Sequence, residues 1–406
     1  MENLLNQLSP MKTGTELLSE MTVLPPYDPK IRLQSATIRL MALSDLYNIY
    51  IPSSMSVEIY SKLYLALLRS LHKKEGISAQ IQRNENHKRI FQRESNNVLG
   101  GSDSFTIIGT SGIGKSTAIN RAIELITEKG ILENSHTKII PCLIAQCPHD
   151  CSVKGLLLEI LRKVDIFLDS DYYPKALKNR VTTDMLIGNV SQIALNHIGL
   201  LVVDEIQNVV NNKNGKALVA MLTQLINSSG ISIAMVGTPE CVIFFEQAMQ
   251  LARRALGLYY SAVEYDQFFY DFCATIFQYQ YVKNKTEISE GIIQWLYDHS
   301  GGIISIVVSL IHDAQEIAIL SGTETLDFDT LNEAYQKRLS MLHTFISPSK
   351  PIPRKKKSEP PIPTVKVEEK AVLNEKIFDI VSTAKGQNSD IVSLLQKNII
   401  IEVITI

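Results

Sequence analysis

At residues 109–116 the sequence reads Gly109-Thr110-Ser111-Gly112-Ile113-Gly114-Lys115-Ser116, the G-x-x-x-x-G-K-S pattern of a phosphate-binding P-loop. An apolar, β-branched run precedes it at 105–108, and apolar residues at helical spacing follow it from Thr117 to Ile126. The motif therefore lies between a predicted strand and a predicted helix, where backbone N–H groups and the helix N-terminus favour an anion. We predict that residues 109–117 bind ATP, with Lys115 on the β- and γ-phosphates and the Ser116 hydroxyl on Mg²⁺.

Residues 105–240 alternate predicted strands and helices, which is typical of a parallel sheet covered on both faces. We place strands at 105–109, 139–146, 199–204 and 231–237, with helices at about 115–129, 153–168, 183–196 and 214–228. The third strand is an apolar run that ends in Asp204 and Glu205, the Walker B pattern. Asp204 is predicted to hold Mg²⁺, and Glu205 to orient and polarise the attacking water. The two motifs together predict a magnesium-dependent ATPase.

Two further places are candidates for sensing the nucleotide. Thr238 follows the fourth predicted strand, where AAA+ ATPases carry a polar residue that senses the γ-phosphate; a plain turn residue is the alternative. Arg253 or Arg254, on a predicted helix end, is a candidate arginine finger that reaches a neighbouring subunit's nucleotide. A basic pair on the surface is the alternative. A finger acting between subunits would make hydrolysis depend on assembly.

Composition narrows the class of protein. The chain has 406 residues and a net charge of −2, so it is long enough for two or three domains and is not basic overall. Its five cysteines fit a reducing cytoplasm better than a disulfide framework. We find no signal peptide at the start, and the longest apolar run, near 303–311, is too short to span a bilayer.

Cys142, Cys147, His149 and Cys151 could bind zinc, although buried or incidental thiols explain them better.

The predicted fold class is α/β, an AAA+ P-loop NTPase with a parallel sheet, an N-terminal helical extension and a small C-terminal helical lid. We divide the chain into an arm and helices at 1–100, the nucleotide-binding core at 101–264, the lid at 265–346 and a Pro/Lys-rich linker and docking tail at 347–406. The first 30 residues are either an arm that docks on a neighbour or a loose tail. The apolar end, Ile391 to Ile406, either docks on another protein or packs back on its own domain. Positions 303–305, after the Gly301-Gly302 turn, lack the sensor arginine of many such lids, which gives more weight to an arginine from a neighbour.

Several segments in order resemble the TnsC/TniB type of AAA+ transposition regulator over roughly residues 30–345: GTSGIGKST, SVKGLL, LLVVDEIQN, VGTPE, LARRAL and SGGII. The resemblance implies ATP-dependent assembly on double-stranded DNA as rings or filaments, in a bacterial cytoplasm and without a membrane. It also implies that the protein links a target-selection protein to the transposase. Carried over to this sequence, Lys115, Ser116, Asp204 and Glu205 form the nucleotide site. Lys154 becomes a candidate DNA contact, and the tail after residue 346 would engage the transposase.

The charge of the chain agrees with such an assembly. At a net charge of −2, DNA binding would depend on a few lysines repeated in many subunits, with steep salt dependence and little sequence specificity. The alternative is a nucleotide-switch NTPase of signalling or defence that acts through protein partners without DNA. A weaker third candidate, an origin or helicase-loading ATPase, would need a winged-helix module, and the C-terminal region shows none.

Overall fold

The computed structural model describes residues 4–75, 104–128, 130–133, 138–178, 181–210, 212–242 and 257–339. All of them belong to the unit Met1–Pro348. The candidate fingers Arg253 and Arg254 and the tail after residue 346 lie outside the described residues. The division of the chain at 1–100, 101–264 and 265–346 stays a prediction.

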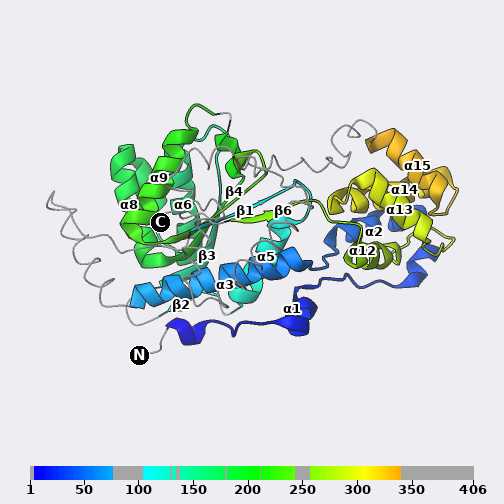
Figure 1. The fold of residues 1–406 in the computed structure, drawn as a ribbon, viewed down its shortest axis with the longest axis horizontal. Helices are drawn as coiled ribbons and strands as arrows, with labels where there is room; N and C mark the ends of the chain where they lie inside the picture. The colour runs from blue at the N-terminus through cyan, green and yellow to red at the C-terminus, as the bar shows by residue number, and fades with distance from the viewer. Residues whose placement is uncertain are drawn as a thin grey trace, which may run out of the picture. The chain divides into compact units, whose positions relative to one another are not determined.

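A six-stranded sheet forms the centre of the described α/β region, in the order β2-β3-β4-β5-β1-β6 (Figure 1). The strands are β1 (Phe105–Gly109), β2 (Leu132–Glu133), β3 (Lys138–Gln146), β4 (Ile198–Asp204), β5 (Ser232–Gly237) and β6 (Leu258–Tyr260). Every pairing is parallel except that of β2 with β3. The four strands predicted from sequence are confirmed to within a residue at each end, whereas the short strands β2 and β6 were not predicted. Because β5 lies between β4 and β1, the P-loop, the Walker B acids and Thr238 follow neighbouring strands.

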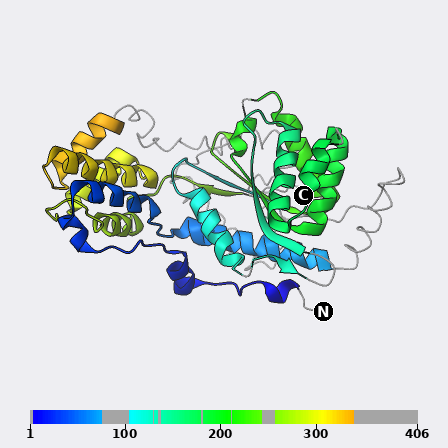
Figure 2. The same ribbon diagram turned by 180° about the vertical axis from the view of Figure 1, so that it is seen from behind.

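Helices cover both faces of this sheet, as the two opposite views show (Figures 1 and 2). The helices α3 (Ser54–Glu75) and α5 (Lys115–Ile126) lie on one face. The other face carries α6 (Val153–Leu168), α8 (Thr183–His197) and α9 (Gly215–Ser229). Strand β4 contributes side chains to the hydrophobic core on each face. Leu200 and Val202 lie in the core with α3 and α5, Leu201 and Val203 lie in the core with α6, α8 and α9, and all four are fully buried. A strand buried on both faces reads as a continuous apolar run, which is why the Walker B segment has that pattern.

Two connections in this region were not predicted. Helix α7 (Tyr172–Lys178) joins α6 to α8, and the short helix η4 (Ile206–Val209) follows β4. The predicted α/β fold with a mainly parallel sheet, helices before it and helices after it is confirmed.

A helical lid follows the sheet, with α12 (Gln267–Phe277), α13 (Glu290–Ser300), α14 (Ile304–Ser321), α15 (Phe328–Ala334) and the π-helical turn η5 (Tyr335–Leu339). Its core gathers around α14, whose Val307, Leu310 and Ile311 are buried. Among the described helices, α14 is the one that length and composition would allow to cross a membrane. Half of its 18 residues are buried inside this protein, so packing in the lid accounts for its apolar character.

Residues 4–30 pack on their own chain, which corrects the expectation of a loose tail for the first 30 residues. The N-terminal region contains η1 (Leu4–Gln7), α1 (Gly14–Met21) and η2 (Pro29–Leu33), and α2 (Ala36–Ala42) and η3 (Leu43–Asn48) follow. Leu17 and Met21 of α1 are fully buried in the core of α3 and α5, because the apolar side chains of this segment cover α3. Leu43 and Leu46 are buried in the core of the lid.

Candidate active site

The P-loop joins β1 to α5 through two glycines in the left-handed region. Gly112 has φ +80° and Gly114, at the N-cap of α5, has φ +96°. A side chain would strain both positions, which is the physical reason for glycine in the motif. The first loop residue is also anchored, since the Thr110 N–H donates to the Tyr260 carbonyl at 3.2 Å. The loop therefore takes its shape from its own glycines and from the edge strand β6.

Lys115 begins α5 and is only 9% exposed. Its ammonium donates to the carbonyls of Gly109, at 2.7 Å, and Thr110, at 2.8 Å. Burial lowers the pKa of Lys115, and the carboxylates of Asp204 and Glu205 act in the opposite direction. A buried cation bonded only to neutral carbonyls would gain from phosphate oxygens, because charge-assisted hydrogen bonds are stronger.

Ser116 and Asp204 meet although 88 positions separate them in sequence: the Ser116 hydroxyl donates to Asp204 Oδ2 at 3.0 Å. The other oxygen, Oδ1, accepts the backbone N–H of Glu205 at 2.8 Å, which orients the carboxylate. A hydroxyl and a carboxylate are hard oxygen ligands of the kind that Mg²⁺ prefers. The two residues that the sequence assigns to the metal thus lie together and fit it.

Glu205 follows β4 in a left-handed conformation, with φ +59°. Its carboxylate is exposed and accepts a hydrogen bond from the side-chain amide of Gln207. The other amide atom, Gln207 Oε1, is buried without a hydrogen-bond partner among the described residues, beside Gly237 at the end of β5. Sequence reasoning missed Gln207, and the only signal was an amide two residues after the acid. Gln207 therefore holds the side chain of Glu205, the acid that the sequence predicts to polarise water.

Thr238 is half-buried directly after β5, between the strands that carry the P-loop and Walker B. Its carbonyl accepts the backbone N–H of Cys241 at 3.2 Å, which forms a turn at the strand end. This position is compatible with the sensing role and with the plain turn.

The lid contacts the P-loop at the place where the sensor arginine is missing. The Ser305 N–H donates to the Gly112 carbonyl at 3.0 Å, and the Val263 N–H donates to the Gly302 carbonyl at 3.0 Å. A Cβ built on Gly112 would lie 2.3 Å from the Ser305 hydroxyl oxygen. The main chain of the lid therefore approaches the loop that an arginine would otherwise reach.

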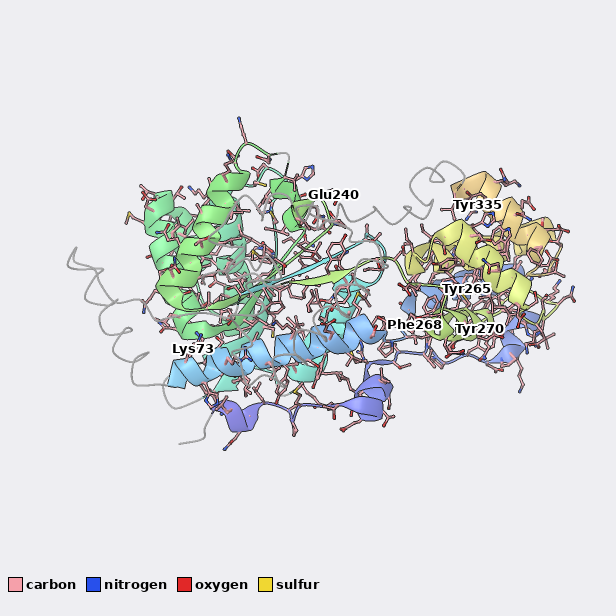
Figure 3. The ribbon with its side chains drawn as sticks, in the orientation of Figure 1. Lys73, Glu240, Tyr265, Phe268, Tyr270 and Tyr335 are labelled. Carbon is pink, nitrogen blue, oxygen red and sulfur yellow. The ribbon has the colours of Figure 1, made fainter. Side chains whose placement is uncertain are left out.

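A cavity of about 470 Å³ opens beside the P-loop. Ile113 of the loop lines it, together with Met55 near the start of α3 and residues of the segment 259–268 that leads into the lid. Figure 3 labels one of its lining residues, Phe268, at the start of α12. Mixed polar and apolar walls suit a small organic ligand, so this cavity is the candidate place for the nucleoside. The sequence shows no motif for it, because its walls come from three distant segments.

Lys154 lies apart from these groups, exposed on the second residue of α6. The helix begins at Ser152, whose hydroxyl accepts the Gly155 N–H at 3.0 Å. The cysteines near it are buried, and burial raises the pKa of the Cys147 thiol to about 12. Within the described ranges, the group spaced to hold a metal is instead His312, Asp313 and Glu316, and Arg338 already pairs with both acids.

Comparison with known proteins gives one family. Residues 100–258 match the family described as bacterial TniB protein. The search of curated proteins found no match.

Three solved structures are similar at low identity. They are the ORC1 protein of Aeropyrum pernix in complex with DNA (13% identity, TM-score 0.42, 63% of this chain and 64% of that one), the ORC2 protein of the same organism (15%, 0.38, 64% and 67%) and a Walker-type ATPase of Pyrococcus abyssi (12%, 0.39, 73% and 77%). The match spans slightly less than two thirds of the ORC1 chain. These TM-scores are low, so the fold is assigned from the strand order and the P-loop.

The resemblance seen in the ordered motifs is thus confirmed over the α/β region. The chain has a P-loop nucleotide-binding α/β fold, and its residues 100–258 match the bacterial TniB family.

Proposed function

We propose that this protein is an ATP-dependent regulator of DNA transposition, which assembles on double-stranded DNA and links a target-selection protein to the transposase. One observation carries the proposal. The hydroxyl of Ser116 and the carboxylate of Asp204 meet at 3.0 Å, with Glu205 beside them, inside the segment that matches the TniB family. This contact supports a site for magnesium and nucleotide inside the segment that matches the TniB family.

In the proposed mechanism Lys115 exchanges its two loop carbonyls for phosphate oxygens. Ser116 and Asp204 would hold Mg²⁺, which would supply charge neutralisation when bound. Glu205 orients the attacking water and withdraws a proton from it, while Thr238 reports on the γ-phosphate. The nucleoside lies in the cavity beside Ile113.

The proposed control of hydrolysis is assembly. The lid turn at 303–305 offers isoleucines and a serine in place of an arginine, so the missing positive charge would come from a neighbouring subunit, through Arg253 or Arg254. We place the protein in the bacterial cytoplasm, with the tail after residue 346 engaging the transposase.

Electron microscopy of the full chain tests the proposal, with a random-sequence DNA duplex and either an ATP analogue, ADP or no nucleotide. Rings or filaments on DNA that need the ATP analogue are the expected result. Oligomers that form with nucleotide but ignore DNA would overturn it in favour of a nucleotide switch that acts through protein partners.

A further inference from the structure

Two loops lie side by side at the carboxyl ends of strands β3 and β4, where the Walker B acids also lie. The first, residues 147–152, follows β3, and the second, described at residues 205–210 and 212–214, follows β4. The strands are parallel neighbours whose last residues, Gln146 and Asp204, are paired, so both loops leave the sheet at one level. The Cys147 N–H also donates to the Asp204 carbonyl at 2.8 Å, which extends this pairing into the first loop.

Three asparagines of the second loop bind the backbone of the first. The side-chain amide of Asn208 donates to the Cys147 carbonyl at 3.0 Å, that of Asn212 to the His149 carbonyl at 3.3 Å, and that of Asn214 to the Asp150 carbonyl at 3.0 Å. The second loop is itself tightly turned, since a Cβ on Gly215 would lie 2.2 Å from the Val209 carbonyl oxygen. These bonds join the two loops at successive points, and we call residues 147–154, 208–210 and 212–216 the two-loop surface.

Three lysines project from the two-loop surface. Lys154, Lys213 and Lys216 are all exposed, and none has an ion pair within the described part of the chain. Some exposed lysines elsewhere are paired: Lys175 and Lys337 each pair with an acid one helical turn away. The acid nearest to Lys154 in sequence is Asp150. Its carboxylate accepts a hydrogen bond from the Ser152 N–H at 3.0 Å and forms no ion pair with a lysine among the described residues. The surface therefore presents positive charge that no neighbouring acid neutralises by contact.

We propose that the two-loop surface contacts the phosphate backbone of duplex DNA, with Lys213 and Lys216 acting beside Lys154 and the three asparagines acting as positioning residues. This inference rests on the proposed function. Lysine ammonium groups bind phosphate as point charges, without the directional pairing that reads bases. The asparagine amides, which could read bases, are used for the loop contacts. Repetition of three lysines in each subunit of an assembly makes such binding multivalent.

Salt-dependent binding tests the inference. Anisotropy of a labelled random-sequence duplex is measured over a salt series with the full chain and an ATP analogue. Lys213→Ala and Lys216→Ala are each expected to weaken binding several-fold and to flatten the slope of log K against log salt by about 0.9 for each lost phosphate contact. Lys213→Arg keeps the charge and restores binding. The matched control is Lys178→Ala, an exposed lysine on α7, which leaves binding and slope unchanged.

The asparagines have their own test, Asn212→Ala with Asn214→Ala. This double variant keeps every lysine, yet it is expected to weaken binding and flatten the salt slope, because the lysines lose their fixed positions. A merely structural role would leave that slope as in the wild type. Nucleotide affinity, measured on each variant, shows that the fold is intact.

The outcomes separate the two proposals. Wild-type binding to DNA with unchanged affinity and slope in the lysine variants overturns this inference alone. No binding of the wild type to DNA with the ATP analogue overturns the proposed function, and the inference falls with it.

Discussion

At the scale of single residues, Glu205 shows how the end of one strand presents an acid to solvent. Its left-handed conformation turns the chain directly after β4, so that Ile206 is buried and the carboxylate of Glu205 is exposed. Such a conformation costs a non-glycine residue about 1–2 kcal/mol. The bonds from the Glu205 N–H to Asp204 and from Gln207 to the Glu205 carboxylate offset part of that cost.

Glu205→Gln removes the base and keeps the size of the side chain. We expect normal ATP binding and hydrolysis slower by about 100-fold or more, because the attacking water loses its proton acceptor. Phosphate release measures the rate. The control is Glu240→Gln, which should keep its turnover. Glu240, labelled in Figure 3, is an exposed acid that follows strand β5. Wild-type turnover in Glu205→Gln would remove this residue from its role.

Lys115→Ala removes the buried ammonium that the loop surrounds. Nucleotide affinity is expected to fall by at least about 100-fold, since a charge-assisted contact to phosphate is lost. Calorimetric titration with ATP measures it, and thermal unfolding without nucleotide checks that the fold survives. Unchanged ATP affinity would contradict the assignment of the P-loop.

At the scale of elements, the contact between the lid turn and the P-loop depends on the absence of side chains. Gly301 and Gly302 both have positive φ, and a Cβ on Gly302 would lie 2.0 Å from the Val263 carbonyl oxygen. On the other side, Gly112 faces Ser305 and Ile303. Helix α14 can therefore begin directly against the P-loop.

Gly112→Ala tests this contact. The new methyl group would meet the Ser305 hydroxyl at a backbone angle that alanine disfavours, so we expect a loss of about 1–2 kcal/mol in the free energy of unfolding. ATP affinity should fall as well. Gly188→Ala in α8, where a Cβ meets nothing within 4 Å, is the control and should be neutral or stabilising by up to about 1 kcal/mol. Denaturant titration compares the two, and equal stability would show that the lid contact tolerates a side chain.

At the scale of the whole described chain, the N-terminal segment contacts both the sheet region and the lid. Leu17 is buried beside α3 and α5, whereas the Tyr27 hydroxyl donates to the Gln280 carbonyl at 2.6 Å. Arg39, 1% exposed, donates to both carboxylate oxygens of Glu324, at 2.6 and 2.7 Å. These contacts join the start of the chain to a lid residue 285 positions away.

The pair of Arg39 and Glu324 predicts a dependence of stability on pH. The hydrogen bond from Arg39 holds the pKa of Glu324 below its usual 4.5. The stabilisation is therefore fully present above pH 4.5 and is lost as the pH falls through the lowered pKa of the folded protein.

Glu324→Gln measures that contribution. At neutral pH the free energy of unfolding should fall by about 1–3 kcal/mol, because Arg39 stays buried without its charge partner. The difference from wild type should shrink below pH 4.5. Glu333→Gln, which breaks an exposed pair with Lys337, should cost less than about 1 kcal/mol. A difference that stays constant with pH would show that the charge of Glu324 does not matter.

The sequence by itself determined the strands and helices of the α/β region and predicted the residues of the nucleotide site, because both depend on local patterns. The P-loop glycines, the apolar run before Asp204 and the helical spacing after Ser116 each lie within a short segment, where periodicity and backbone preference act directly. The short strands β2 and β6 and the split of residues 29–48 into short helices escaped prediction, since segments of a few residues have too little pattern.

Only the tertiary structure decided which distant side chains meet. The order of the strands brings Ser116 to Asp204, and the packing of neighbouring loops sets three asparagines on the carbonyls of 147–150. The approach of Ser305 to Gly112 and the bond of Arg39 to Glu324 likewise join separate segments. The physical reason is that such contacts follow from how buried faces pack together, and no local pattern in a sequence records that arrangement.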